Sequence, residues 1–376
     1  MKIFHIISGL GPGGAEHMLC RLAGAMTDAQ HLVYSVSGNG VMAEPLRAAG
    51  AIILNDDQRG TARNLASLRR HMARHAPDIV QGWMYHGNAV SIPSPFMSQK
   101  SKLFWNIRQS LTDMKHVKAS TRLIIRSQAL LSRVPSGIIY NALSAALDHE
   151  KIGFSEKRRV IIPNGFDCNK FKPDDVARTK IRAELGLNQD KTVVGLIARH
   201  DSWKNHEGFF RMAGNLLERH PDVAFVLAGH GIEWSNPALS SLIQGERLRQ
   251  SVHLLGDRRD VAAVNAALDI ACNVSHGEGF PNAVGEAMAC GIPCIVTPVG
   301  ASPDLVADDQ LIARSTKDHD LITTMDRLLL ATPGERRAIG AAGRARILKH
   351  FSIDAVARRY LDLYLGSGDR QVDAAM

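Results

Sequence analysis

The amino-acid sequence predicts an α/β protein with two doubly wound, parallel-sheet domains. Short apolar runs alternate with amphipathic stretches along the chain, which indicates parallel strands joined by covering helices. The 376 residues are enough for two hydrophobic cores of ordinary size. The segment 161–173 breaks the alternation with two prolines and an Asn-Gly turn, and it is therefore predicted to link the two domains.

The elements follow from this alternation. In the first half we expect a helix at Ala15–Ala25 and strands at Lys2–Ser8, Leu32–Val36, Ile52–Leu54, Ile79–Gln81, Leu103–Ile107 and Ile138–Asn141. In the second half we expect helices at Glu207–Arg219 and Val261–Ala267 and strands at Thr192–Ala198, Ala224–Ala228, Val252–Leu255, Ile270–Val274 and Cys294–Thr297.

Composition narrows the class of protein. A hydrophobic fraction of 45% and a charged fraction of 22% are typical of soluble globular proteins. The five cysteines match neither a redox pair nor a zinc site in their spacing. The first apolar stretch is too short for a signal peptide, and no run approaches the ~20 apolar residues that span a bilayer. These features predict a cytoplasmic protein with reduced thiols.

Positive charge is concentrated in residues 61–140. This block holds twelve lysines and arginines against two aspartates, within a chain whose net charge is +8. Such a block can attract an anionic membrane surface, a phosphorylated acceptor or nucleic acid. A solvated basic face without a partner is the alternative. Nucleic acid is not expected, because no nucleic-acid-binding motif accompanies the charge.

A glycine-rich loop, Gly9–Glu16, joins the first predicted strand to the first helix. Glycines let the backbone approach a ligand, and the unpaired N–H groups at a helix start attract anions. The spacing of Gly9, Gly11 and Gly14 matches the dinucleotide fingerprint, but no acidic residue ends the second strand. The loop therefore predicts a phosphate contact and disfavours a dehydrogenase.

Two cations follow the first strand of the second half. Arg199 and Lys204 lie in the loop after that strand, at the carboxyl edge where doubly wound sheets bind ligands. Two such cations can hold a diphosphate and stabilise it as a leaving group in place of a metal ion. The alternative is a pair of solvated surface charges.

Two glutamates lie in the segment 275–293. A helix is expected to begin near Pro281 or Asn282 and to stop at Gly291, which places Glu278 in the preceding loop and Glu286 in the second turn. Carboxylates bind sugar hydroxyls, and the first amides of a helix bind phosphate oxygens. The helix dipole alone explains Glu286 poorly and does not explain the surrounding glycines.

Taken together, these motifs resemble glycosyltransferase family 4, whose members adopt the GT-B fold of two Rossmann-like domains facing each other across a cleft. The residues that carry this resemblance cover nearly the whole chain: 13–16, 78–88, 105–108, 162–167, 199–204, 227–231, 254–256, 278 and 286. One departure is visible, because relatives often have Asn-Ser where this chain has Asn141-Ala142. That departure puts a contact by the serine in doubt.

The resemblance implies a division of the chain. Residues 1–163 would bind the acceptor, with a C-terminal helix at about 351–366 packing back onto them. Residues 164–350 would bind the donor nucleotide-sugar, and residues 367–376 would be a disordered tail.

The resemblance also implies roles for individual residues. Arg199 and Lys204 would clamp the donor diphosphate, Glu278 would contact the donor sugar near the reacting centre, and Glu286 would bind the ribose. His86 would lie near the reacting sugar, unless it is a histidine satisfied inside the fold. Further donor contacts are implied for Gly13 and Gly14, for the backbone of Gly279, Phe280, Pro281, Asn282, Ala283 and Val284, and for the backbone of Gly256 to Arg258 at the base.

The expected reaction is transfer of a sugar, with retained anomeric configuration, from a UDP-sugar to a glycan or polyprenyl-diphosphate-linked acceptor. No cofactor and no metal ion are expected. Residues 120–133 form a predicted helix of the acceptor domain that could lie against an anionic membrane or could be an ordinary packed helix with a basic face. A UDP-sugar 2-epimerase of similar fold and a non-catalytic sugar-nucleotide-binding protein remain the alternatives.

Overall fold

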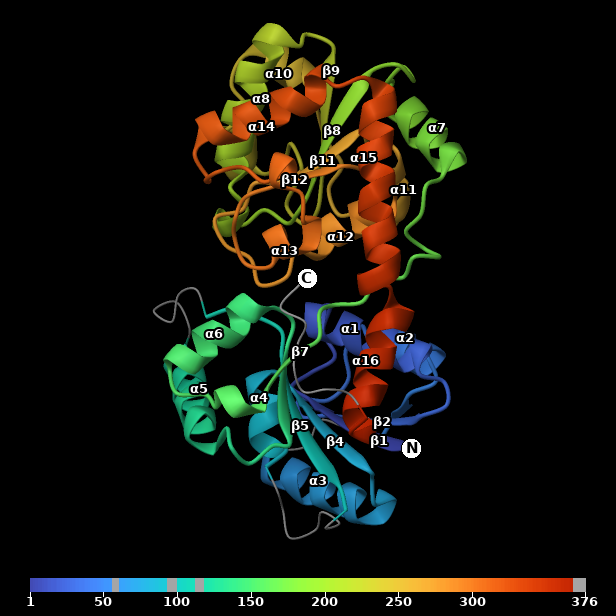
Figure 1. Cartoon of the computed structure of the whole chain (residues 1–376), viewed down its shortest axis with the longest axis vertical. Helices are drawn as coiled ribbons and strands as arrows, with labels where there is room; N and C mark the ends of the chain where they lie inside the picture. Colours follow the sequence, from blue (N-terminus) through green and yellow to red (C-terminus); the bar gives the residue numbers. More distant parts are fainter. Residues whose placement is uncertain (56–60, 93–99, 112–117, 368–376) are drawn as a thin grey trace. The chain divides into compact units, whose positions relative to one another are not determined.

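The computed structural model describes residues 1–55, 61–92, 100–111 and 118–367, with the side chains of 61–65 left out. The chain forms two compact units. Unit 1 contains Met1–Gly165 together with the C-terminal helix, and unit 2 contains Phe166–Ser352 (Figure 1). Each unit is an α/β sheet covered by helices, as the sequence predicts.

The sheet of unit 1 is parallel, and in the described residues its order is β3-β2-β1-β4-β5-β6-β7. The strand order reverses between β1 and β4, which is the switch point of a doubly wound sheet. β7 is absent from the strands that the sequence predicts. The strands are β1 (Lys2–Ile7), β2 (Gln30–Ser35), β3 (Ile52–Ile53), β4 (Ile79–Trp83), β5 (Lys102–Ile107), β6 (Gly137–Tyr140) and β7 (Arg159–Ile161).

The helices of unit 1 lie on both faces of this sheet. In Figure 1, α1, α2 and α16 lie on one side of it and α4, α5 and α6 on the other. The helical segments are α1 (Gly14–Ala25), α2 (Ala43–Ala48), α3 (Thr61–His75), α4 (Met84–Val90), α5 (Ala119–Leu131), α6 (Leu143–Lys151), the 3-10 turn η1 (Glu156–Arg158) and α16 (Ile353–Leu365).

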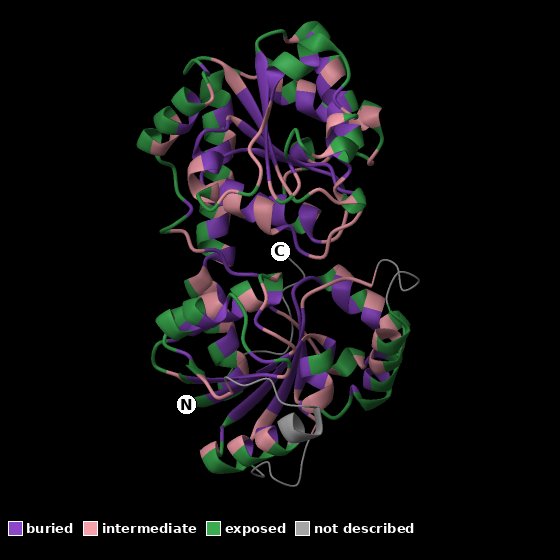
Figure 2. Cartoon of the chain, turned by 180° about the vertical axis from the view of Figure 1, so that it is seen from behind, coloured by how far each residue is buried: buried purple, intermediate pink, exposed green. Residues whose placement is uncertain are grey.

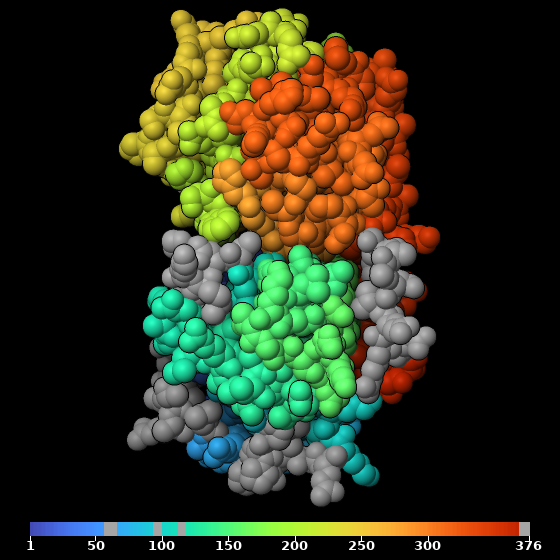
Figure 3. Space-filling model, turned by 60° about the vertical axis from the view of Figure 1, so that its left-hand side comes forward, coloured from blue at the N-terminus to red at the C-terminus, as the bar shows by residue number. Residues whose placement is uncertain are grey.

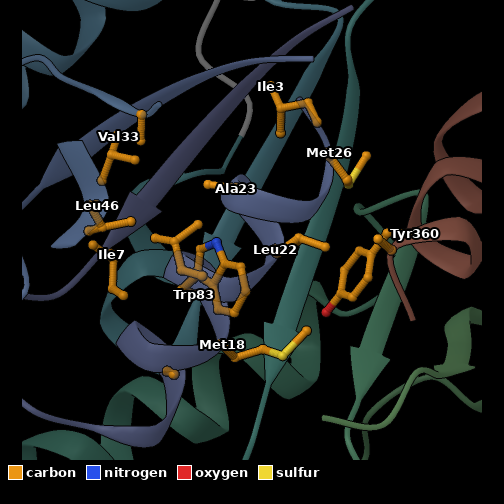
Figure 4. Close-up of a cluster of buried hydrophobic side chains, with 14 of the residues drawn as sticks. Ile3, Ile7, Met18, Leu22, Ala23, Met26, Val33, Leu46, Trp83 and Tyr360 are labelled. Atoms are coloured by element: carbon orange, nitrogen blue, oxygen red, sulfur yellow. The ribbon is translucent and has the colours of Figure 1, made fainter. Parts of the chain in front are cut away.

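The core of unit 1 lies between the sheet and the helices α1 and α16. Met18 and Leu22 of α1 pack with Trp83 at the end of β4 and with Tyr360 of α16 (Figure 4). Tyr364, one turn further along α16, donates a hydrogen bond to Gln81. The last helix of the chain is therefore part of the core of unit 1, although residues 166–352 of unit 2 separate it from the rest of that unit.

Two buried histidines are joined by hydrogen bonds inside unit 1. The indole N–H of Trp83 donates to His5 Nδ1 over 3.1 Å, which leaves the His5 Nε2–H to donate to His31 Nδ1 over 2.9 Å. The second nitrogen of His31 lies 3.2 Å from the carbonyl of Met26. This arrangement needs both imidazoles neutral. Burial, together with the charge of His31, lowers the pKa of His5 well below its ordinary value.

Unit 2 has a second parallel sheet, with the order β10-β9-β8-β11-β12 in the described residues and a switch point between β8 and β11. Its strands are fully buried at the centre and its helices expose their outer faces (Figure 2). The strands are β8 (Thr192–Ile197), β9 (Val223–Ala228), β10 (Val252–Leu254), β11 (Ile270–Asn273) and β12 (Cys294–Val296).

The helical segments of unit 2 connect these strands and extend to the end of the unit. They are α7 (Asp175–Glu184), η2 (Ser202–Lys204), α8 (His206–Arg219), α9 (Pro237–Ser240), α10 (Glu246–Ser251), α11 (Val261–Ala266), α12 (Asn282–Ala289), α13 (Ser302–Val306), η3 (Asp309–Leu311), α14 (Asp318–Leu330), α15 (Pro333–Arg346) and η4 (Ile347–Phe351). Across the described parts of both units, none of the helices has the length and apolar character needed to cross a bilayer.

The basic block predicted at residues 61–140 does not form one surface. Arg108 is drawn inside unit 1, where it donates to Asn164 Oδ1 at 2.7 Å and to the Tyr360 hydroxyl at 2.9 Å. Lys102 donates to the carbonyl of Tyr364 at 2.8 Å. The other described cations are dispersed: Arg69, Arg70 and Arg74 lie on α3, Arg122 and Arg126 lie on α5, and Lys100, Lys118 and Arg133 lie outside both helices (Figure 1). The side chain of Arg63, residues 112–117 and the predicted disordered tail after Ser367 lie outside the described residues.

Candidate active site

Most of the predicted site residues lie at the switch point of each sheet, whereas Gly256 and Arg258 follow the edge strand β10. In unit 2, the loop that carries Arg199 and Lys204 follows β8, and the loop that carries Glu278 follows β11, its neighbour across the switch point. In unit 1, the glycine loop follows β1 and His86 follows β4, again on the two strands where the order reverses. Ligands of doubly wound sheets bind in the crevice at this position.

The loop after β8 is held by local hydrogen bonds. Asp201 accepts the backbone N–H of Trp203 at 2.9 Å and so caps η2, and its other oxygen accepts from Arg199 at 3.1 Å. Burial opposes ionisation of Asp201, but this N–H and the guanidinium together lower its pKa. The carbonyl of Trp203 accepts from the backbone of His276 at 2.8 Å, which joins this loop to the loop after β11.

Lys204 and Glu278 form a mostly buried ion pair. The ammonium Nζ of Lys204 donates to Glu278 Oε1 at 2.6 Å, and the side chains are 22% and 8% exposed. The same oxygen accepts from Asn273 Nδ2 at 3.0 Å and from Ser275 Oγ at 2.7 Å. Three donors on one oxygen fix the position of the carboxylate. The structure thus brings together two residues that lie 74 positions apart in the chain.

The backbone after Glu278 is also fixed. Gly300 has φ +56°, and a Cβ atom at this position would collide with the carbonyl of Glu278. The N–H of Ala301 donates to the carbonyl of Gly279 at 3.1 Å. Only glycine combines this left-handed conformation with so close a backbone approach.

Helix α12 begins at Asn282, where the sequence predicts it. Its N-cap, Pro281, carries no side chain that can cap it, and the first turn contains no acidic residue. The start of the helix therefore presents its positive dipole end without a capping carboxylate of that turn. Phe280 is buried between the rings of Phe166 and Phe351, so that its backbone and not its side chain is available to a ligand. Glu286 lies half-buried in the second turn, and Ala283 and Val284 lie in the first.

In the segment near Gly256 that is predicted to bind the base, Arg258 forms salt bridges with other residues of unit 2. Arg258 bonds Glu184 at 2.6 Å and Asp260 at 2.7 Å, and these two carboxylates raise its pKa. Gly256 has φ +64°, and its N–H donates to the carbonyl of Ile232. The base contact stays a prediction, because the carbonyl of Gly256 also accepts a hydrogen bond, from the N–H of Gly229 at 2.8 Å.

In unit 1, Gly13 is the N-cap of α1 and Gly14 is its first residue. The carboxylate of Glu16 lies beside Gly13, where a Cβ atom would collide with its Oε2. Burial raises the pKa of Glu16. The predicted phosphate loop thus has a carboxylate at its helix start. His86 is exposed on α4, which excludes the alternative of a histidine satisfied inside the fold.

Sequence reasoning missed the residues that support the site. Asn273 and Ser275 hold Glu278, and Gly300 makes room for its backbone. A signal was present, since a buried strand that ends in Asn-Val-Ser carries polar side chains where the apolar run stops.

In the part of the chain that the structure describes, no group of three or more His, Cys, Asp or Glu side chains is placed to hold a metal ion.

With this geometry in view, the similarities to known proteins are specific. Residues 177–346 match the family described as Glycosyl transferases group 1. This stretch of the chain is therefore similar to the group 1 glycosyltransferases. It contains the predicted donor residues Arg199, Lys204, Glu278 and Glu286, whereas the glycine loop and His86 lie outside it. The match supports the predicted class of enzyme, and the number of the family stays a prediction.

Two curated relatives show the range of this class. The chain is 30% identical over 225 residues to a GDP-mannose-dependent alpha-(1-6)-phosphatidylinositol monomannoside mannosyltransferase of Mycolicibacterium smegmatis, covering 56% of this chain and 53% of the relative. It is 32% identical over 151 residues to the UDP-Gal:alpha-D-GlcNAc-diphosphoundecaprenol alpha-1,3-galactosyltransferase of Escherichia coli, covering 40% and 39%. The chain thus matches about half the length of the M. smegmatis relative and less than half the length of the E. coli relative.

Solved structures match over nearly the whole length. HepE of Anabaena in complex with UDP superimposes with a TM-score of 0.82 at 22% identity, covering 98% of this chain and 100% of HepE. WaaG, a glycosyltransferase involved in lipopolysaccharide biosynthesis, superimposes with a TM-score of 0.70 at 16% identity, covering 97% and 100%. At these identities the likeness establishes the fold, and the predicted GT-B class is confirmed.

Proposed function

We propose that this chain is a retaining glycosyltransferase that moves a sugar from a UDP-sugar to a hydroxyl of a glycan or lipid-linked acceptor. The observation that carries the proposal is the ion pair of Lys204 and Glu278 at the switch point of the sheet of unit 2, in the same loop system that leads into the N-terminus of α12. A cation, a carboxylate and a helix start at one sheet edge suit a ligand that joins a diphosphate to a sugar.

In this proposal the leaving group is stabilised by fixed positive charge. As the bond between the anomeric carbon and the phosphate oxygen breaks, negative charge grows on the diphosphate. Lys204, Arg199 and the amides at the start of α12 would meet that charge. Preorganised donors of this kind are worth about 3 kcal/mol each when they face developing charge. Arg199 is 66% exposed and so is accessible to a ligand.

The bonds balance without an enzymic nucleophile. The acceptor oxygen would attack the face of the sugar from which the diphosphate departs, and its proton would pass to the departing phosphate oxygen. Glu278 would bind the sugar close to the oxocarbenium-like centre. Its position, fixed by Asn273 and Ser275, would let its carboxylate contact the sugar hydroxyls. Attack on the departing face retains the anomeric configuration.

The acceptor would bind unit 1, where the exposed His86 and the glycine loop lie at the switch point. The relative of M. smegmatis is named for a phosphatidylinositol mannoside and that of E. coli for a diphosphoundecaprenol-linked sugar. A lipid-linked acceptor is proposed on this basis. It would bring the chain to a membrane surface and give the basic residues of unit 1 a partner. A cytoplasmic location belongs to the same proposal.

The base is the least constrained part of the donor. HepE was solved with UDP, whereas the M. smegmatis relative is named for GDP-mannose. The decisive experiment is therefore a panel of UDP- and GDP-sugars, each scored for nucleoside diphosphate release with and without lipid and glycan acceptors. Release that depends on both a donor and an acceptor supports transfer. A new nucleotide-sugar formed without acceptor would instead identify an epimerase.

Site variants make the test specific. Lys204→Met and Glu278→Gln should each lower turnover at least about 100-fold, because each removes a charge that faces the reacting group. Lys151→Met is the matched control, since its ammonium also pairs with a carboxylate but is 74% exposed. Because the proposal needs no metal ion, turnover should survive treatment with EDTA. Wild-type rates in both site variants, or loss of turnover with the chelator, would overturn the assignment.

A further inference from the structure

Trp203 is an exposed tryptophan within the candidate site of unit 2. It lies in the 3-10 turn η2, immediately before Lys204 and four positions after Arg199. It is 40% exposed, although burial of so large an apolar side chain would stabilise a fold more than burial of most others. Single exposed apolar residues are common on protein surfaces, so this exposure alone indicates no site. The partners, the backbone and the position of Trp203 together indicate one.

The indole of Trp203 has no partner within the described part of the chain. Trp83 and Trp105 are fully buried, and each donates its indole N–H to a side chain of unit 1. Trp234 is 43% exposed, and the guanidinium of Arg249 lies over its ring at 5.6 Å. Among the described residues, no hydrogen bond, aromatic ring or cation engages the indole of Trp203. Its apolar face and its N–H are therefore both accessible to a ligand.

The backbone that carries this indole is fixed. The N–H of Trp203 donates to Asp201 Oδ1 at 2.9 Å, and its carbonyl accepts from the backbone N–H of His276 at 2.8 Å. Asn205, two residues further on, has φ +54°, and its side-chain amide donates to the carbonyl of Val274 at 3.1 Å. Such a left-handed backbone is uncommon outside glycine and persists where surrounding contacts hold it. An aromatic ring on a fixed backbone loses little conformational freedom when a ligand binds.

The position of Trp203 indicates which part of a ligand it meets. Successive side chains of a 3-10 turn are about 120° apart, so the indole points in a different direction from the side chain of Lys204. The ammonium of Lys204 is bonded to Glu278, and these two groups are proposed to face the diphosphate and the donor sugar. In Figure 3 the yellow-green loop after β8 and the light-orange loop after β11 meet on the surface of unit 2. Trp203 therefore flanks the proposed sugar contacts.

We propose that Trp203 is a stacking platform for a pyranose ring of a substrate and that it contributes to the choice among sugars. The C–H groups on one face of a pyranose ring form an apolar surface, and the negative face of an indole attracts such groups as it attracts cations. The indole N–H is a donor for a sugar hydroxyl. The inference rests on the proposed sugar transfer and names a residue that recognises one of its substrates. Donor and acceptor both carry such a ring, and kinetics separates the two sources.

A nucleotide base is the other planar ring that stacks on tryptophan. The segment predicted to bind the base follows β10, whereas Trp203 follows β8, and β9 lies between these two strands in the sheet. The sugar end of the donor, by contrast, is assigned to Glu278, whose loop is bonded to the carbonyl of Trp203 through His276. The strand order thus favours a sugar ring over a base as the ligand of this indole.

The first test compares Trp203→Leu with Trp203→Phe in nucleoside diphosphate release. Leucine removes the aromatic face, whereas phenylalanine keeps it. Trp203→Leu should raise KM about fivefold for the substrate whose ring stacks and should change kcat little, because the contact forms in the ground state as well as in the transition state. Trp203→Phe should restore most of the affinity. A higher KM for the donor assigns the ring to the donor, and a higher KM for the acceptor assigns it to the acceptor.

Trp234→Leu is the matched control. Trp234 has a similar exposure, 43%, in the same unit, but Arg249 covers its ring. This variant should keep both KM values. The urea midpoint of Trp203→Leu should equal that of the wild type, because the indole packs little against the fold. Equal midpoints show that a change in KM comes from lost recognition and not from unfolding.

The second test is tryptophan fluorescence, which reports whether this indole is close to a ligand without requiring turnover. The probes are UDP-glucose and GDP-mannose, each compared with UDP or GDP, which lack the pyranose ring. If the donor supplies the ring, a sugar-bearing probe should shift the emission of the wild type and of Trp234→Phe, and Trp203→Phe should lose this shift. If the acceptor supplies the ring, the shift should appear when the acceptor that supports release is added, and again not in Trp203→Phe.

The outcomes separate this inference from the proposed function. Diphosphate release with unchanged KM values for both substrates in Trp203→Leu would overturn the platform alone. A shift of the Trp203 emission by UDP or GDP as large as that by the nucleotide-sugars would assign the indole to the nucleotide and would also overturn it. A wild type that releases no diphosphate from any donor would instead refute the proposed transfer itself.

Discussion

Replacing Lys204 by methionine keeps the length of the side chain and removes its charge. In the native structure Lys204 donates to Glu278 at 2.6 Å, and the carboxylate side chain is only 8% exposed. The variant keeps the hydrogen bonds that Asn273 and Ser275 donate to that carboxylate, which are both from neutral groups. The ion pair should therefore support the fold of unit 2 as well as catalysis, and this variant should lose stability together with activity.

The magnitude follows from the burial of the pair. Removing one partner of a fully buried pair costs about 3–5 kcal/mol. Lys204 is 22% exposed, and the hydrogen bonds from Asn273 and Ser275 to Glu278 remain, so we expect about 2 kcal/mol for Lys204→Met. Glu278→Gln should cost about 1 kcal/mol, because the lysine can reach water. The double variant has no unpaired charge and should cost about 1 kcal/mol, which implies a coupling of about 2 kcal/mol.

The assay is urea unfolding of the four proteins, followed by hydrogen exchange of the peptides that contain β8 and β11. Local exchange is needed because the two units need not unfold together. If the losses of unfolding free energy in the two single variants sum to the loss in the double variant within about 0.5 kcal/mol, the two residues are not coupled. That result would refute the ion pair as a structural element of the site.

Unit 1 should lose stability below about pH 6.5. Burial lowers the pKa of His5 and of His31, so both stay neutral in the folded protein but take up protons when it unfolds. A urea midpoint that does not change between pH 7.5 and pH 5 would contradict this. Ala142→Ser should stabilise unit 1 by about 1 kcal/mol, because the extended N-cap of α6 has no side-chain hydrogen bond; an unchanged midpoint would show that the hydroxyl finds no N–H. Gly300→Ala should abolish most turnover, because a Cβ atom there collides with the carbonyl of Glu278. Gly245→Ala is the control and should keep turnover, because Gly245 also has a positive φ, +85°, but open space around it. Equal rates in the two variants would mean that the loop that carries Glu278 tolerates displacement.

The fold was predictable because its signals are local. β9 is a continuous apolar run and β1 is one that only His5 interrupts, as expected for parallel strands buried on both faces. The predicted ends of these two strands lie within one residue of the observed ends. The strand β7 was not among the predicted strands because its apolar run, Val160 to Ile162, is short and lies between the charged residues 156–159 and Pro163, so that the sequence indicated no more than a strand end there.

The candidate site was predictable as a set of residues and not as a set of contacts. Arg199, Lys204 and Glu278 could be chosen because each follows a strand at the carboxyl edge. The sequence did not reveal that Lys204 bonds Glu278 while Arg199 bonds Asp201. It also could not separate the cations of residues 61–140, of which Arg108 is internal and Arg126 faces solvent.

The sequence by itself therefore determined the class of fold, the loops that carry the chemistry and the resemblance to glycosyltransferases. These features can be recognised in short stretches of sequence, from the spacing of apolar residues, the position of glycines and the residues that follow each strand. Only the tertiary structure decided partners that are distant in the chain. Strand order placed β8 next to β11 and so brought Lys204 to Glu278, and the packing of α5 decided which of its apolar side chains are buried and which face solvent. A linear pattern cannot fix such pairings, because they depend on which strands and helices become neighbours.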